Sequence, residues 1–99
     1  MRECSSLDEV RKCIDDVDGR LVRLLAERRG YVIQASRFKT SDADVRVPAR
    51  VEQVISKVRW LAGVEGVEPD VVEAVYRRMI EGFIAIEGAA QRERSGEAG

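Results

Sequence analysis

The sequence predicts an all-α protein with three helices, one long and two shorter, that forms a helical homodimer. Apolar residues recur at spacings of three and four in three separate segments, and no segment alternates with the period of two that is typical of a strand. Prolines suited to the first turn of a helix stand at positions 48 and 69. The 99 residues are expected to form one domain, 1–99, with a helical core at about 5–88 and a flexible tail at 89–99.

The first helix is expected to begin after Ser6, because the sequence Ser6-Leu7-Asp8-Glu9 fits a capping box. Its apolar series is interrupted once, by Arg28, and consists of Leu7, Val10, Ile14, Val17, Leu21, Leu24, Tyr31, Ala35 and Phe38. The series predicts a helix of about 34 residues, which would be roughly 50 Å long. A helix of that length cannot bury its stripe against itself, so we expect a second copy of the chain to cover it.

The two shorter helices are expected to follow a loop at 40–47. One should begin at Pro48 and end at Gly63, and the other should begin at Pro69 and give way to a frayed polar tail after Gly88. The residues expected to face inward are Val51, Val54, Ile55, Val58 and Leu61 in the first, and Val72, Val75, Met79, Ile80, Phe83 and Ile84 in the second.

Composition excludes several classes of function. A net charge of −1 argues against general nucleic-acid binding, and no apolar run approaches the ~18 residues of a membrane span. The N-terminus has no signal-peptide pattern, so a cytoplasmic location is expected. Two cysteines and no histidine argue against a disulfide framework and a zinc site, and neither a metal nor a cofactor is expected. Any catalysis must depend on arginine, lysine, carboxylates and backbone groups.

Two cations lie on or near the apolar stripe of the first helix. Arg28 stands where leucine would be the ordinary residue, and Lys39 follows eleven positions later, within about 20° of the same helical face. Val32 and Ala35 lie between them and are apolar. This face favours a small ligand with two negative groups, because a buried charge needs a partner. A structural interpretation is also open: Arg28 can extend to water, and Lys39 suits the C-terminal end of a helix.

Arg11 and Glu87 are the remaining candidates. Arg11 lies about 25 Å from Arg28 along the helix, so it could complete the site only across an antiparallel dimer; otherwise it is a surface residue. Glu87 shares a face of the last helix with Phe83 and Ile84, and it would either pair with a cation or act on a ligand.

These residues, in this order, resemble the all-helical chorismate mutases. The resemblance runs from about Cys4 to Glu87 and rests on Leu7-Asp8-Glu9-Val10-Arg11, Ile14-Asp15, Asp18, Leu24-Leu25-Ala26-Glu27-Arg28-Arg29 and Lys39. The isochorismate pyruvate lyase branch is more similar still, through Ser36-Arg37-Phe38-Lys39-x-Ser41, Pro48-x-Arg50-Val51 and Phe83-Ile84-Ala85. The resemblance implies an intertwined homodimer of three-helix protomers that acts on a small dicarboxylate, either chorismate or isochorismate.

The resemblance also implies roles for individual residues. Arg28 would bind one carboxylate, Arg11 of the other protomer would bind the second, and Lys39 would donate to the ether oxygen and to a carboxylate. Lys39, Glu87 and Arg28 are therefore the expected catalytic residues. The other expected substrate-binding residues are Arg11, Val32, Ala35, Val47, Arg50, Val51, Phe83 and Ile84. Both family reactions are pericyclic and need no nucleophile, metal or obligatory general base, and catalysis consists of holding a reactive conformer and stabilising charge on the ether oxygen.

Two departures from the family pattern affect the choice of reaction. Mutases commonly place acids near the start of the second helix to hold the 4-hydroxyl of chorismate, whereas this chain has Val47 and Val51. Isochorismate lacks that hydroxyl, so an apolar wall favours the lyase. The second departure is Glu87, where glutamine is common in the family. Since a glutamate can donate only when it is protonated, we expect a rate that falls as pH rises.

Other interpretations stay open on the sequence alone. The enzyme could be a chorismate mutase that makes prephenate, or a mutase on a 4-amino analogue of chorismate. A non-catalytic member of the family could regulate another enzyme of the shikimate pathway through its helices. The chain could also be a helical dimerisation module without a small ligand, in which case Arg28→Ala would be neutral or stabilising.

Overall fold

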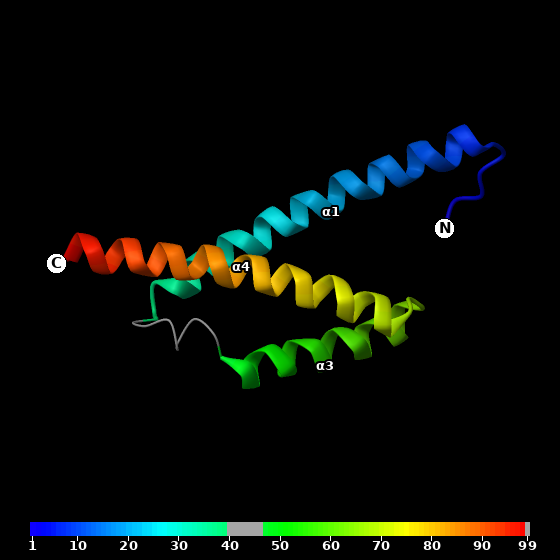
Figure 1. The fold of residues 1–99 in the computed structure, drawn as a ribbon. Coiled ribbons are helices and arrows are strands. Elements are labelled where there is room, and N and C mark those ends of the chain that lie inside the picture. Colours follow the sequence, from blue (N-terminus) through cyan, green and yellow to red (C-terminus); the bar gives the residue numbers. More distant parts are fainter. Residues whose placement is uncertain (40–46, 99) are drawn as a thin grey trace. The chain divides into compact units, whose positions relative to one another are not determined.

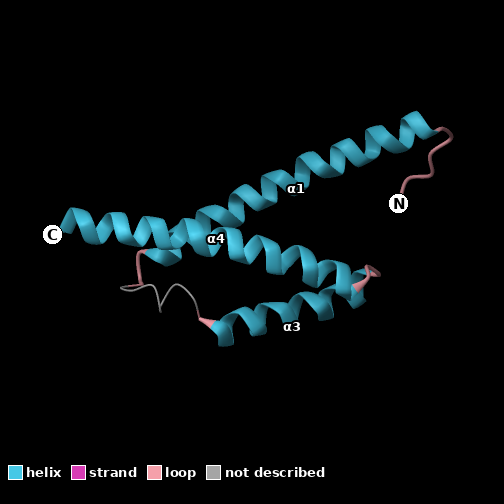
Figure 2. Ribbon diagram, in the orientation of Figure 1, coloured by secondary structure: helices cyan, strands magenta, loops and turns pink. Residues whose placement is uncertain are grey.

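The computed structural model describes residues 1–39 and 47–98, and all regular structure in these residues is helical. The helices are α1 (Leu7–Ser36), α3 (Pro48–Glu65) and α4 (Pro69–Ala98) (Figure 1, Figure 2). The prediction of an all-α chain with three helices is confirmed. The prediction of one long and two shorter helices is wrong, because α4 equals α1 in length, with 30 residues each. Chain contacts divide the protein into two units, Met1–Tyr31 and Val32–Gly99.

The first unit is the N-terminal part of α1 with the six residues before it. The expected helix start at Ser6 is confirmed, because Ser6 Oγ accepts the Glu9 N–H at 3.2 Å. The Glu9 carboxylate accepts the N–H of Ser5 at 2.9 Å, one residue before the N–H that a standard capping box uses. This unit contains no second element, so its apolar stripe has nothing within the unit to pack against, and Leu21 and Leu24 are 53% and 60% exposed.

The second unit contains an antiparallel pair of helices, α3 and α4, that lie side by side (Figure 1). Its small core consists of Ile55, Val58, Ala62 and Ile80. Burying a valine or isoleucine side chain contributes roughly 1.5–3 kcal/mol. Leu61 and Val75, which we expected to face inward, are 39% and 57% exposed, and Ala62 takes the inward position at the end of α3.

Helix α3 ends at a different glycine from the expected one. Helix α3 continues through Gly63 to Glu65, and Gly66 closes it with φ 75°, in the left-handed region. The N–H groups of Gly66 and Val67 both donate to the carbonyl of Ala62, the latter at 2.9 Å. Gly66 is needed here because a side chain is strained at positive φ.

Helix α4 also differs from the prediction, because it does not end near Gly88. The residues expected to fray continue the helix to Ala98, and Gly88 and Gln91 are buried. The polar composition after Gly88 suggested a tail, but contacts with the end of α1 hold this segment, as described below. The last part of α1, from Val32, and all of α4 therefore belong to the same unit.

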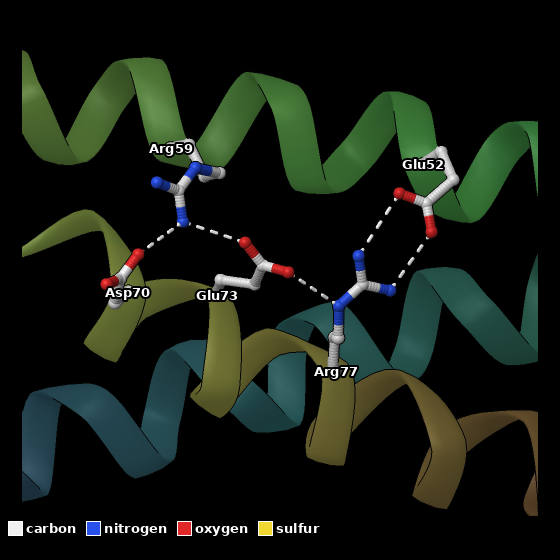
Figure 3. Close-up of polar contacts among 5 residues, drawn as sticks. All are labelled: Glu52, Arg59, Asp70, Glu73 and Arg77. Carbon is white, nitrogen blue, oxygen red and sulfur yellow. Dashed lines mark hydrogen bonds and ion pairs between the residues drawn. The ribbon is translucent and has the colours of Figure 1, made fainter.

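Five charged side chains link α3 to α4 on the exposed side of the pair (Figure 3). Arg59 of α3 contacts Asp70 and Glu73 at 3.0 and 2.7 Å, and Arg77 of α4 contacts Glu73 at 2.8 Å and both oxygens of Glu52 at 3.1 Å. The guanidinium of Arg77, and then that of Arg59, lowers the pKa of Glu73 against the opposing effect of desolvation. The network joins the two helices of the pair.

Candidate active site

The candidate site in the second unit lies where the end of α1 meets α4. Helix α1 ends at Ser36, and three successive N–H groups then bond to carbonyls three residues earlier: Arg37 to Gln34, Phe38 to Ala35 and Lys39 to Ser36, at 3.0–3.2 Å. This tight turn, rather than the α-helix itself, places Lys39. The expectation that Lys39 occupies an α-helical face shared with Arg28 is therefore wrong, because the helix stops three residues before Lys39.

Lys39 Nζ donates to Glu87 Oε1 and forms an ion pair with it. The Lys39 side chain is 27% exposed and that of Glu87 is 5% exposed, so this pair is shielded from water far better than the charges on the surface. Of the two roles expected for Glu87, pairing with a cation is confirmed. Two predicted site residues that are 48 positions apart in the sequence thus meet at one point.

Phe83 and Ile84 lie one turn before Glu87 on α4 and are half-buried. Their spacing of four and three residues from Glu87 places all three on one face of the helix. This face combines an apolar surface with a single buried carboxylate. Such a surface suits the ring of a small ligand beside a polar group that acts on one of its substituents.

Val47 and Val51 stand at the start of α3, where Val47 is the residue before the first turn and the Val51 N–H donates to its carbonyl at 3.1 Å. The two side chains are therefore one turn apart, and the predicted apolar pair is continuous along this helix end. Val47 is 40% exposed and Val51 is half-buried. Arg50 is exposed, and its Nη1 donates to Gln53 Oε1 within the same helix at 2.7 Å.

The remaining candidates lie on α1. Val32 is half-buried and Ala35 is exposed, and both belong to the second unit with Lys39 and Glu87. Arg11 and Arg28 belong to the first unit, where Arg11 is exposed and Arg28 is half-buried. The roles expected for both arginines remain predictions.

The last part of α4 contributes two polar residues that we did not predict from the sequence. Gln91 is only 7% exposed, and Arg94 donates from both terminal nitrogens to Ser36, at the end of α1. Glu87, Gln91 and Arg94 follow at spacings of four and three, which is the period of one helical face. That period was the available signal, and it was missed because this segment was expected to fray.

Two further observations concern the described residues, 1–39 and 47–98. None of the helices in these ranges is both long enough and apolar enough to cross a membrane. No group of three or more acidic or cysteine side chains in the same ranges could hold a metal ion.

The chain is similar to a known protein family and to a curated protein. Residues 10–88 match the family described as chorismate mutase type II. A curated protein named isochorismate pyruvate lyase, from Pseudomonas aeruginosa, is 34% identical over 97 residues, and the match covers 97% of this chain and 95% of that protein. The match to the lyase extends over nearly the whole chain, whereas the family match covers most of α1, all of α3 and α4 as far as Gly88.

Proposed function

The chain belongs to the chorismate mutase type II family, an enzyme family, and we propose that this member is an isochorismate pyruvate lyase. It would convert isochorismate into salicylate and pyruvate. The observation that carries the proposal is the meeting of Lys39 with Glu87 beside an apolar helix face. The identity of 34% with a protein named for this activity supports the same reaction.

The proposed reaction breaks one C–O bond and moves one hydrogen within the substrate. As the ether bond between the ring and the enolpyruvyl group breaks, a ring hydrogen passes to the methylene carbon of that group, which leaves as pyruvate. The electron pair of the broken C–O bond becomes part of the carbonyl of pyruvate. The electron pair of the broken ring C–H bond forms the third ring double bond, which makes the ring aromatic as salicylate. Negative charge develops on the ether oxygen in the transition state, so a donor aimed at that oxygen accelerates the reaction.

We assign Lys39 as the donor to the ether oxygen. Its ammonium is only partly exposed, and in this setting a cation stabilises developing charge more strongly than it would in water. Glu87 neutralises this ammonium in the structure, and the proposal requires the substrate to take over the interaction. A protonated Glu87 could then supply a second hydrogen bond to the same oxygen.

The substrate carboxylates would be bound by Arg28 and, from a second protomer, by Arg11. The packing of the first unit supports a homodimer, because its α1 segment carries a long apolar stripe with no second element in that unit to cover it. Residues 1–99 would then form one domain in each protomer of an intertwined dimer. The substrate would be bound without a metal, a cofactor or nucleic acid, and we propose a cytoplasmic location.

Chorismate mutase activity is the second candidate, because the matched family carries that description. Val47 and Val51 argue against it as the main reaction. Chorismate has a ring hydroxyl at the position that these apolar side chains would face, and burying that hydroxyl without a partner costs about 1–3 kcal/mol. We therefore expect a slow mutase activity beside the lyase activity.

The experiment that tests the proposal compares isochorismate and chorismate as substrates of the purified protein, with salicylate and prephenate as the measured products. Salicylate as the dominant product would support the lyase. Prephenate as the dominant product would make the protein a mutase, and no turnover of either substrate would contradict the proposal and favour a regulatory role. Arg28→Ala should abolish turnover and leave the helical circular dichroism signal unchanged.

A further inference from the structure

We propose that Arg94 is a positioning residue that holds the backbone of Lys39 at the site by bridging two oxygens of Ser36. This inference rests on the proposed function, because it assigns Arg94 a role in the reaction through Lys39. The bond between Arg94 and Ser36 joins residues 58 positions apart and lies wholly within the second unit.

The geometry around Ser36 is specific. Ser36 is completely buried and is the last residue of α1. Its hydroxyl donates to the carbonyl of Ile33 and accepts from Arg94 Nη1 at 3.0 Å, while Arg94 Nη2 donates to the Ser36 carbonyl. The planar fork of arginine can contact two oxygens at once, which a lysine ammonium cannot do with the same geometry.

The Ser36 carbonyl is also the acceptor of the Lys39 N–H, at 3.2 Å. The Ser36 carbonyl oxygen therefore accepts two hydrogen bonds, one from the backbone N–H of Lys39 and one from the guanidinium of Arg94. The last carbonyls of a helix accept no hydrogen bond within the helix, and they attract cations. Arg94 therefore stabilises the end of α1, where the turn to Lys39 begins.

Helix α4 consequently holds the end of α1 at two points. Glu87 binds the side chain of Lys39, and Arg94, two turns or about 10 Å further along the same face, binds the backbone that precedes it. Substrate binding should affect the Glu87 contact and the Arg94 contact differently. The proposed reaction requires Lys39 to leave Glu87 for the substrate, whereas the Arg94 contact stays in place.

Arg94 is thus the contact that keeps Lys39 in position while its side chain is engaged with the substrate. Its guanidinium is committed to Ser36, which argues against a direct role in binding a carboxylate. Loss of Arg94 should let the turn at 37–39 move and misplace the Lys39 ammonium. A misplacement on the order of 1 Å of a group that acts on the reacting atoms can lower the rate by up to roughly a hundredfold.

The test compares Arg94→Met, Arg94→Lys and Arg78→Met in the 99-residue chain. Arg78 is exposed on the same helix, so Arg78→Met removes the same charge and serves as the control. For Arg94→Met we expect kcat with isochorismate to fall between about tenfold and a hundredfold, with KM raised only by about twofold, since Lys39 acts mainly in the transition state. Arg94→Lys should recover part of kcat, and Arg78→Met should change neither constant.

Hydrogen exchange of the amides of residues 37–39 gives a readout that does not depend on turnover. Arg94→Met should speed exchange at the Lys39 amide and leave exchange in α3 unchanged, at a temperature where circular dichroism shows all variants folded. Faster exchange together with a lower kcat would support the inference. Unchanged exchange, or a kcat equal to that of Arg78→Met, would overturn the inference. Salicylate formation by the unaltered protein would in that case still support the proposed function. If the unaltered protein formed no salicylate, the proposed function would fail, and the positioning role would fail with it.

Discussion

Lys39 and Glu87 form a cross-element ion pair in which the carboxylate is 5% exposed and the ammonium is 27% exposed. Lys39 lies in the turn that follows α1, and Glu87 lies in α4, so the ion pair links this turn to α4. A buried ion pair costs desolvation and adds little net stability when compared with apolar packing. Its location beside Phe83 and Ile84 agrees with the proposed function, in which the substrate would take over the interaction with Lys39.

The first prediction concerns the pH dependence of turnover. Only a protonated Glu87 can donate to the ether oxygen, so the rate should fall as pH rises. Glu87→Gln carries a donor at every pH and should flatten the profile of kcat against pH. The control is Glu93→Gln, the same change at an exposed position of α4, which should keep the slope of the unaltered protein. A flat profile in the unaltered protein would contradict this role for Glu87.

Much of the helical pattern followed from local sequence signals. Ser6 and Glu9 identified the first N-terminus, and Pro48 and Pro69 identified the other two, because caps and prolines act through neighbouring backbone groups. The end of α3 was harder to place, since Gly63 and Gly66 are both permissive. In the structure the carbonyl of Ala62 accepts hydrogen bonds from the N–H groups of Gly66 and Val67, and these bonds place the end of α3 at the second glycine.

The candidate site was predicted in part because its residue types were informative and its contacts are not local. The sequence indicated that Glu87 could pair with a cation, and Lys39 is that cation. It did not indicate the contact of Arg94 with Ser36, because a polar segment near a chain end resembles a frayed tail when its distant partner is unknown. The helical-wheel argument for Lys39 failed for a related reason: no local signal showed that α1 ends at Ser36.

The second prediction tests whether Arg11 acts in trans. Arg11→Ala and Lys39→Ala should each be inactive as homodimers. When the two variants are mixed and allowed to exchange protomers, each heterodimer should contain one intact site, which gives about a quarter of the unaltered activity in an equal mixture. The measurement is salicylate formation before and after exchange.

A matched mixture provides the control for that experiment. Arg28→Ala and Lys39→Ala alter two residues expected in the same protomer's part of the site, so no heterodimer of these variants contains an intact site. This mixture should stay inactive. No activity in the first mixture would place Arg11 in the same protomer's site as Lys39, and full activity of Arg11→Ala alone would place it outside the site. Activity in the second mixture would mean that Arg28 and Lys39 come from different protomers.

The third prediction concerns the apolar pair at the start of α3. Val51→Glu places a carboxylate where a mutase would hold the 4-hydroxyl of chorismate. The ratio of prephenate formed from chorismate to salicylate formed from isochorismate should rise about tenfold or more, because the buried hydroxyl gains a partner. Val51→Leu keeps the wall apolar and should leave the ratio within about twofold of the unaltered protein. An equal fall in both activities after Val51→Glu would show that Val51 supports the fold and does not select the substrate.

The fourth prediction concerns stability in acid. The guanidinium of Arg77, followed by that of Arg59, holds the pKa of Glu73 below its ordinary value of 4.5. A carboxyl group with a pKa lowered in the folded state binds fewer protons there than in the unfolded chain. It therefore stabilises the fold above the unfolded pKa, and this contribution is lost as pH falls through the lowered value.

Glu73→Gln should consequently lower the melting temperature near neutral pH and have little effect once the carboxyl of the unaltered protein is protonated. The difference in melting temperature between the two proteins should narrow as pH falls from about 7 to about 3. Glu65→Gln, at an exposed position that ends α3, is the control and should show a much smaller difference at every pH. A difference that stays constant across this range would mean that Glu73 contributes through packing, because the loss of an ion pair must follow the titration of its carboxylate.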